Sequence, residues 1–323
     1  MATARCRQIC LSETKYYHCI SRCVRQAYLC GKDIATGRSY EHRRDWVEEK
    51  LLALKKTFCI DVCAYAVMNN HTHIVLHVDI QKAKRLTDKA IIIRWHKQFK
   101  GNCLTHKFIR NEPLSDAERS ILDNTINIYR SRITCISWFM RTLNEYIARR
   151  ANQEDQCTGR FWEGRFKSQA LLDEAALAAC MAYVDLNPIR ANLAKLPEES
   201  KYTSVKKRIE LARQGKQPRS LFRFAGNPRK HMPKGIPLEL SSYLELVELT
   251  GRCIRSDKIG YIKNKQPILD RLNLTSKNWI TLTTQFSTVI HGAAGSSAAK
   301  QKYCDSLSIQ RRSNISNCVA LFG

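Results

Sequence analysis

The chain has 323 residues, with 54 Lys and Arg against 29 Asp and Glu, which gives a formal net charge of +25. An excess of this size indicates a polyanionic partner, either nucleic acid or an anionic membrane surface. No apolar run reaches the roughly 18 residues of a membrane span and no signal-peptide pattern opens the chain, so a cytoplasmic nucleic-acid-binding protein is favoured over a membrane or secreted one.

The N-terminal quarter predicts a short arm, three strands and one helix. Residues 1–15 are polar and are expected to form a loose arm, and 15–23 have the composition of a strand. A helix is expected over 40–56 because apolar residues recur there at helical spacing. Strands are expected over 58–68 and from His71 onward, and they would form a hairpin because Asn69-Asn70 between them suits a tight turn.

The third strand carries the pattern His71-Thr-His73 near its start. Side chains two apart on a strand lie on the same face, so both imidazoles can face one divalent ion. Such an ion usually takes a third protein ligand. His77 shares this face but lies about 13 Å beyond His73 along a strand, too far to join the ion, and the remaining histidines, including His18, are assigned structural roles.

The middle of the chain predicts mostly helix. A basic helix is expected over 81–100 and an amphipathic helix from Ile136 to Arg150, whereas 101–131 lacks strong periodicity and predicts an inserted loop or a small helical excursion. The 14 cysteines include three pairs separated by three residues, unlike the two-residue spacing of zinc knuckles and redox motifs. They are interpreted as buried thiols rather than disulfides or structural metal ligands.

The segment 159–167, Gly-Arg-Phe-Trp-Glu-Gly-Arg-Phe-Lys, interleaves cations with aromatics. Cations can hold phosphates while an aromatic ring stacks on an unpaired base. The alternative is that the aromatics are core residues and that the cations alone are exposed. Function is favoured for the cations, and the aromatics are left open between the two interpretations.

A helix is predicted from 175 to 187, with Asp173 as its N-cap and Pro188 ending it. Tyr183 and Asn187 lie four residues apart and so share a helix face. A tyrosine beside a metal ion is a suitable nucleophile toward a phosphodiester, because the covalent phosphotyrosine conserves bond energy for rejoining. Tyr183 would otherwise be interpreted as a core aromatic residue.

Beyond residue 200 the composition changes. Residues 201–237 predict a basic linker rich in Gly, Pro, Lys and Arg, and 238–323 predict a small helical C-terminal extension. The tail from about residue 292 is expected to be poorly ordered.

Two stretches resemble a known family. Met68-Asn-Asn-His71-Thr-His73-Ile-Val-Leu76 resembles the histidine signature of HUH nucleases. The segment 159–168, followed by Ala182-Tyr183-Val-Asp-Leu-Asn187-Pro188-Ile-Arg190, resembles the distal block of REP-associated tyrosine transposases, within the single-tyrosine transposases. Order and spacing agree across about residues 14–197. Thr72 and Asn69 depart from the family pattern, which usually has an aliphatic residue and a proline there.

The resemblance implies an α+β fold with a ferredoxin-like (RRM-like) antiparallel sheet. It implies a catalytic domain over 1–200 that uses Mg²⁺ or Mn²⁺ to cleave and rejoin single-stranded DNA near hairpins, through a 5′-phosphotyrosine, in the nucleoid of a bacterial cytoplasm. By matching positions His71, His73 and Asn187 are the metal ligands and Tyr183 is the nucleophile. The residues expected to contact DNA are Arg22, Arg25, Arg160, Trp162, Arg165, Lys167 and Arg190.

Two other functions remain possible from the sequence: a regulatory hairpin-binding protein without catalysis, and a metalloenzyme in which water attacks the phosphate. Monomer and homodimer are equally compatible with the sequence.

Overall fold

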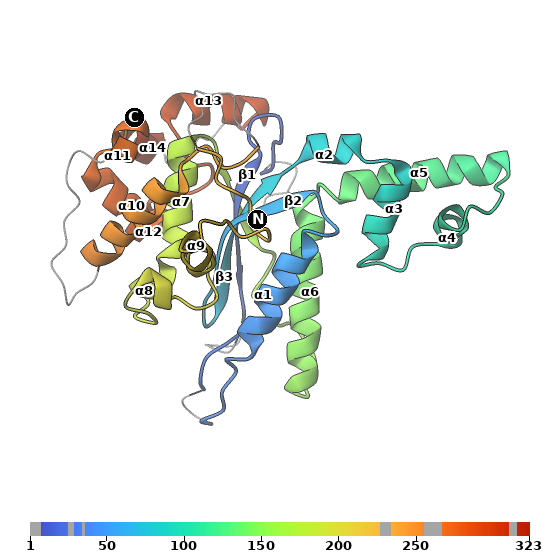
Figure 1. Ribbon diagram of the computed structural model, residues 1–323, viewed down its shortest axis with the longest axis horizontal. Helices are drawn as coiled ribbons and strands as arrows, with labels where there is room; N and C mark the ends of the chain where they lie inside the picture. Colours follow the sequence, from blue (N-terminus) through green and yellow to red (C-terminus); the bar gives the residue numbers. More distant parts are fainter. Residues whose placement is uncertain (1–7, 25–28, 34–35, 227–233, 255–266, 310–314) are drawn as a thin grey trace.

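The computed structural model describes residues 8–24, 29–33, 36–226, 234–254, 267–309 and 315–323. Its centre is a four-stranded antiparallel sheet of β1 (Tyr16–Arg22), β2 (Ile60–Val67), β3 (His71–Val78) and β4 (Lys167–Leu171), in the order β2-β3-β1-β4. Helices lie on both faces of this sheet (Figure 1). The α+β class and the β2–β3 hairpin predicted from the sequence are confirmed, and β4, which was not predicted, completes the sheet.

Alternation along the central strands divides their side chains between two cores. Tyr17, Ile74 and Leu76 point to the face covered by α1 (Arg43–Leu54) and α6 (Ile136–Glu154). Val75 points to the opposite face, beneath α7 (Glu174–Asp185). Because successive residues of a strand alternate between faces, the odd-numbered histidines of β3 also lie on the α7 face.

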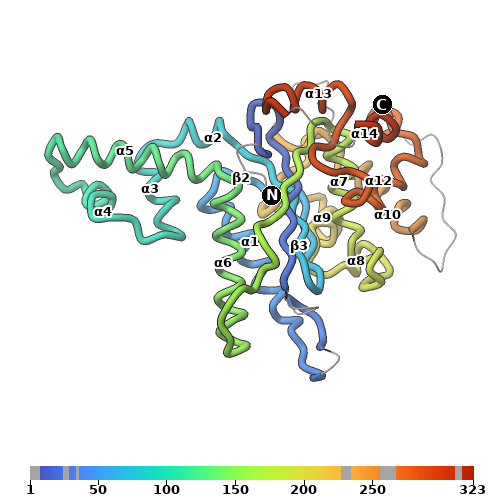
Figure 2. The backbone as a smooth tube through the Cα atoms, turned by 180° about the vertical axis from the view of Figure 1, so that it is seen from behind, coloured from blue at the N-terminus to red at the C-terminus, as the bar shows by residue number. Residues whose placement is uncertain are grey.

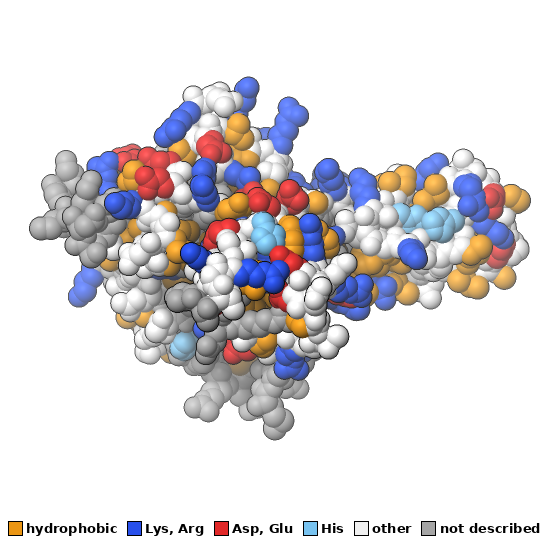
Figure 3. All heavy atoms as spheres, turned by 90° about the horizontal axis from the view of Figure 1, so that it is seen from below, with side chains coloured by type: hydrophobic (Ala, Val, Ile, Leu, Met, Phe, Trp, Pro, Cys, Tyr) orange, Lys and Arg blue, Asp and Glu red, His pale blue; other side chains and the backbone are white. Residues whose placement is uncertain are grey.

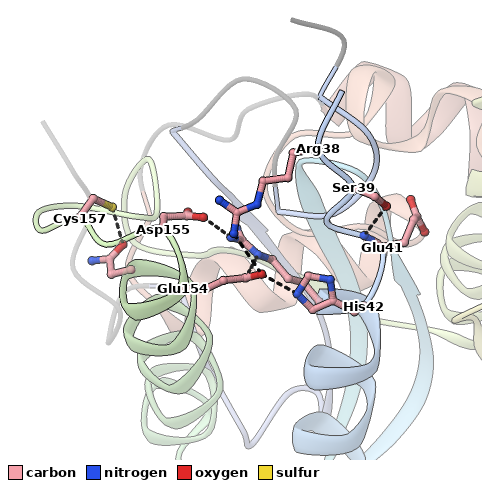
Figure 4. Close-up of polar contacts among 9 residues, drawn as sticks. Arg38, Ser39, Glu41, His42, Glu154, Asp155 and Cys157 are labelled. Carbon is pink, nitrogen blue, oxygen red and sulfur yellow. Dashed lines mark hydrogen bonds and ion pairs between the residues drawn. The ribbon is translucent and has the colours of Figure 1, made fainter. Parts of the chain in front are cut away.

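A buried guanidinium joins the ends of α1 and α6. Arg43 is fully buried; its Nε donates to Glu154 at 2.7 Å and its Nη2 donates to Asp155. His42 Nε2 lies 2.8 Å from the same Glu154 carboxylate, and Figure 4 shows His42 and Arg38 both directed toward it. A buried charge is tolerated only when it is paired, so this cluster fixes the start of α1 against the end of α6.

An arm of helices projects from the body on the side of α6 (Figure 2). It contains α2 (Ile80–Arg85), α3 (Asp88–His96), α4 (Cys103–Ile109) and α5 (Asp116–Arg132). A separate small core holds the arm together, with Trp95, Ile126 and Tyr129 buried in it. The helical excursion expected over 101–131 is therefore present and has its own apolar face.

The prediction of a single basic helix over 81–100 is wrong, because the segment forms two helices, α2 and α3. The chain leaves helical geometry at Leu86 and restarts at α3, where the Thr87 hydroxyl accepts from the Ala90 amide at 3.3 Å. Threonine hydrogen-bonds readily to a nearby backbone amide, so it favours an N-cap over a helix interior.

The other face of the sheet is covered by α7 and by the C-terminal third. After α7 come α8 (Asn187–Arg190), a 3-10 turn (Pro197–Glu199), α9 (Ser204–Ala212), α10 (Leu240–Cys253), α11 (Pro267–Arg271), α12 (Ser276–Val289), α13 (Ser297–Ser306) and α14 (Ile315–Phe322). Figure 1 shows α12 alongside α7, and residues of both helices share one core.

The helices expected over 238–323 are present, whereas the segments 201–237 and beyond 292 differ from the predicted linker and loose tail. Helix α9 lies inside the segment 201–237, and its Arg208 is fully buried, donating to the carbonyl oxygens of Cys63 and Phe222 at 2.7 and 3.1 Å. The tail beyond 292 contains two helices, whose Tyr303 and Phe322 are buried. Apolar side chains of the described C-terminal helices share one core with α7.

Among the described residues, no helix is both long and apolar enough to cross a membrane. The cysteines that the structure describes are free thiols, most of them buried, in agreement with their interpretation as core residues.

Candidate active site

A cavity of about 540 Å³ opens where β1 and β3 meet the edge of α7. His71, His73 and Tyr183 line it together with Arg22 and Lys167. In the strand register Arg22 lies opposite His71 and Ile20 lies opposite His73. A hairpin strand and a helix more than 100 residues later thus meet at one site within a single chain.

The two histidines are close and differently oriented. Their ring centroids are 4.8 Å apart with an interplanar angle of 80°. His71 Nδ1 lies 2.6 Å from Asn70 Oδ1, and His73 Nδ1 lies 2.9 Å from His18 Nε2. Each ring is therefore held through Nδ1, which leaves Nε2 as the nitrogen able to bind a ligand.

Burial keeps these imidazoles neutral. Desolvation lowers the pKa of His71 to about 4, with a further contribution from the Arg22 charge. The pKa of His73 also lies well below its ordinary value, first because of burial and then because His18 and His71 are adjacent. Neutral imidazoles keep a lone pair for a metal ion at physiological pH.

Tyr183 faces the histidines from α7. Its ring centroid is 5.6 Å from that of His73, edge to face, and its side chain keeps a little exposure, since the residue is 9% exposed. Among the described residues the phenol hydroxyl has no hydrogen-bond partner. The ring is instead packed between two side chains. The Phe286 ring of α12 lies 5.8 Å from it between centroids, and the Arg190 guanidinium carbon lies 3.8 Å from its centroid.

Arg190 is thereby engaged inside the protein. Its Nη1 donates to the carbonyl oxygens of Tyr183 and Thr283 at 2.9 and 2.6 Å, and burial lowers the pKa of the guanidinium to about 10. The sequence predicted a DNA contact for this residue. Its place in the structure gives it a second role that the sequence did not indicate, which is to fix the tyrosine between α7 and α12.

Asn187 does not line the cavity as the structure describes it. The predicted helix from 175 to 187 ends earlier: α7 stops at Asp185, and Asn187 is the first residue of α8 with Pro188 beside it. A proline disfavours helical geometry in the residue before it, yet is well accommodated in the first turn of a new helix. The helical face that aligned Asn187 with Tyr183 is therefore interrupted at Leu186, between α7 and α8. Asp173 caps α7 as predicted.

The predicted cations divide by location. Arg22, Arg165 and Lys167 line the cavity, whereas Arg160 is exposed outside its lining and Arg25 lies outside the described residues. Figure 3 shows Lys and Arg side chains spread over the body and the arm rather than confined to one patch. A phosphate backbone bound at the cavity would therefore meet the positive charges of Arg22, Arg165 and Lys167.

The two phenylalanines of the same segment are core residues. Phe161 and Phe166 are buried on the α1 and α6 face of the sheet. Trp162 is half-buried, and its Nε1 donates to the Asn144 carbonyl at 2.8 Å. Of the two interpretations left open for this segment, core packing holds for both phenylalanines.

Three residues at the site were not anticipated. His18, assigned a structural role from the sequence, is fully buried and stacks on His73 with ring centroids 5.1 Å apart. Phe286 and Ser287 come from α12, where Ser287 lines the cavity and its hydroxyl oxygen is buried without a partner among the described residues. Alternation along 15–23 places His18 opposite the Cys19 face, but nothing local identifies its neighbour across the sheet.

The donor atoms at the site suit a divalent metal ion in part. Two neutral imidazoles with their Nδ1 atoms already hydrogen-bonded are the arrangement that metal-binding histidines usually have. Among the described residues no cluster of three or more His, Cys, Asp or Glu side chains could hold a metal. The remaining positions around an ion at His71 and His73 would fall to an amide, to water or to a bound phosphate.

Comparison with known proteins gives a distant structural likeness. No protein-family model matches the chain, and no curated protein matches it. A solved structure of a REP-associated tyrosine transposase bound to a REP hairpin aligns with 73% of this chain and 97% of that chain, at 11% sequence identity and a TM-score of 0.39. The likeness concerns overall fold alone, so the chemistry of the site rests on its residues.

Proposed function

We propose that this protein is a metal-dependent endonuclease and transposase of the HUH type, which cleaves single-stranded DNA beside a hairpin and rejoins it through Tyr183. The observation that carries the proposal is the meeting of Tyr183 with the His71 and His73 pair in one cavity, 5.6 Å from ring to ring at His73. The strand order β2-β3-β1-β4, with the histidines on a central strand, is also that of a ferredoxin-like sheet and supports the proposal.

The chemistry would use the chain as follows. His71 and His73 would hold Mg²⁺ or Mn²⁺, with Asn187 as the proposed third ligand. When bound, the ion would stabilise the negative charge on a non-bridging phosphate oxygen. The Tyr183 oxygen forms a bond to phosphorus while the bond from phosphorus to the 3′ oxygen breaks. The phenolic proton is released and the departing oxygen takes one up, which leaves a 5′-phosphotyrosine and a free 3′-hydroxyl.

Arg22, Arg165 and Lys167 line the same cavity and would hold the flanking phosphates. Their charge is independent of the metal site, so DNA affinity and cleavage should separate. We expect His73→Ala to abolish cleavage while much of the DNA affinity remains.

The test is adduct formation. The protein is incubated with Mn²⁺ and a labelled DNA hairpin flanked by single strands, and is then denatured. A covalent protein–DNA adduct should form in the wild type and be absent in Tyr183→Phe. Tyr146→Phe is the matched control, because Tyr146 is half-buried on α6 outside the cavity lining and its hydroxyl accepts from Arg150. Cleavage that persists in Tyr183→Phe would instead indicate attack by water.

A second candidate is a hairpin-binding protein of the same fold without catalysis. The position of Asn187 outside the described cavity lining favours it, since the predicted ligand set then lacks a member at the site. Retention of the hairpin in Mn²⁺ without any cut in the wild type would support this function.

A further inference from the structure

The His18 ring connects the proposed metal ligand His73 to the C-terminal third of the chain. His18 Nε2 lies 2.9 Å from His73 Nδ1, and on its other side His18 Nδ1 lies 3.4 Å from Gln169 Oε1. Gln169 Nε2 donates to the Ile290 carbonyl at 2.9 Å, just beyond α12. Four groups from β3, β1, β4 and the C-terminal third thus form one hydrogen-bonded series.

Donor and acceptor roles follow in order along this series. A backbone carbonyl can only accept, so Gln169 must present its NH₂ to Ile290 and its oxygen to His18. That oxygen can only accept, so His18 Nδ1 carries the proton and His18 Nε2 keeps its lone pair. His73 Nδ1 must then donate to His18 Nε2, which leaves the lone pair of His73 on Nε2.

We infer that His18 and Gln169 are positioning residues that set the tautomer of His73, with the Ile290 carbonyl as the fixed end of the series. This inference rests on the proposed function, because the benefit of the tautomer is a lone pair directed at the metal. A metal-binding histidine needs its ligating nitrogen unprotonated and its other ring nitrogen held by a partner. Neutral imidazole in water favours the opposite tautomer, with the proton on Nε2, so His73 has to be held in the less common form.

The series also gives the C-terminal third a role in the site. The Phe286 ring centroid lies 6.3 Å from that of His18 and 5.8 Å from that of Tyr183. The same segment therefore packs against both the proposed nucleophile and His18. His18 is fully buried, and no solvent molecule is needed to complete its bonding. The extension thus acts on the metal ligand without touching it.

The test reads the tautomer directly, in metal-free protein. Long-range ¹H–¹⁵N correlation spectra of histidine-labelled protein distinguish protonated from unprotonated ring nitrogens, and the His73 signals are identified by their loss in His73→Gln. We expect the proton of wild-type His73 on Nδ1. In His18→Leu the proton should move to Nε2, and in His18→Gln, whose side-chain oxygen can accept from His73, it should stay on Nδ1.

Gln169→Leu tests the link to Ile290 while leaving both imidazoles in place, so it remains informative should His18→Leu fail to fold. Without Gln169 the His18 ring can present either nitrogen, and His73 should populate both tautomers. His77→Gln is the matched control: His77 lies on the same face of β3 but stacks on Phe222, 4.4 Å between centroids, outside the series. Its replacement should leave the His73 signals unchanged.

Mn²⁺ affinity, measured by calorimetry, is the second readout. His18→Leu should weaken Mn²⁺ binding about 10–100-fold, as loss of a partner of a ligating histidine usually does, and His18→Gln should largely restore it. A wild-type His73 protonated on Nε2, or an Nδ1 proton that persists in His18→Leu, would overturn the inference. If wild-type protein shows the expected tautomer but binds no Mn²⁺, the proposed function is refuted, while the inference that His18 and Gln169 set the tautomer of His73 is retained.

Discussion

Replacing Arg190 with methionine separates two roles for this residue. Methionine fills a similar volume but removes both hydrogen bonds, to the carbonyl oxygens of Tyr183 and Thr283, and the guanidinium over the Tyr183 ring. Hydrogen bonds from a charged donor contribute about 1.5–3 kcal/mol each, and desolvation of the guanidinium offsets roughly half of the total. We therefore expect a loss of about 1.5–3 kcal/mol in the free energy of unfolding, measured by urea denaturation.

The substitution should change the rate at which Tyr183 reacts rather than the affinity for DNA. With its ring released, Tyr183 should form the DNA adduct at least 10-fold more slowly in Arg190→Met, while DNA affinity changes little. Arg165→Met is the matched control, because Arg165 lines the cavity and is exposed. It should weaken binding and lower the salt slope of the association constant by about one, the expectation for a lost phosphate contact. A similar drop in salt slope for Arg190→Met would refute the positioning role and make Arg190 a DNA contact.

Three further predictions concern stability and charge. Arg43→Met should lower the free energy of unfolding by about 1.5–3 kcal/mol, because the charged hydrogen bonds to Glu154 and Asp155 are lost while both carboxylates stay partly exposed; a loss below 1 kcal/mol in a chemical denaturation series would contradict the role of Arg43 in joining α1 to α6. Burial lowers the pKa of His18 to about 4 from 6.5, so the unfolded state binds more protons between these values. In metal-free protein the contribution of this group to the free energy of unfolding should be complete above about pH 6.5. Between about pH 6.5 and pH 4 the free energy of unfolding should fall by roughly 1.4 kcal/mol per pH unit because of His18, a slope that His18→Gln should reduce. Lys167→Ala should leave adduct formation at low salt intact and weaken binding as salt rises, whereas an unchanged salt response would remove Lys167 from the phosphate contacts.

Local patterns identified much of the fold. Strand composition predicted β1, the Asn69-Asn70 turn predicted the β2–β3 hairpin, and the N-cap at Asp173 marked the start of α7. The spacing of His71 and His73 placed both rings on one face of a strand, because residues two apart always share a face. Each of these inferences uses neighbours within a few residues, for which the backbone geometry is the same in any fold.

Prediction was less successful where a single residue could either continue or end a helix, and where the outcome depended on distant packing. Thr87 could have stayed within a helix, whereas in the structure Leu86 and Thr87 are extended and Thr87 caps α3 through the Ala90 amide. Asn187 was aligned with Tyr183 on the assumption of a continuous helix, whereas the chain bends before Pro188 and begins α8. The helical extension predicted over 238–323 is present, but the packing of α12 against α7 could not be predicted, because it joins segments distant in the sequence.

The sequence by itself determined that His71 and His73 share a strand face, that a helix carries Tyr183, and that the chain has the charge to bind a polyanion. Only the tertiary structure decided that Tyr183 meets those histidines, that His18 holds His73, and that α12 forms a wall of the site. Side-chain periodicity is fixed by covalent geometry along the chain. Helix docking and the pairing of β1 with β3 are instead fixed by which apolar surfaces can be buried together, and at this site the groups concerned are distant in the sequence, as are His18 and His73, 55 residues apart.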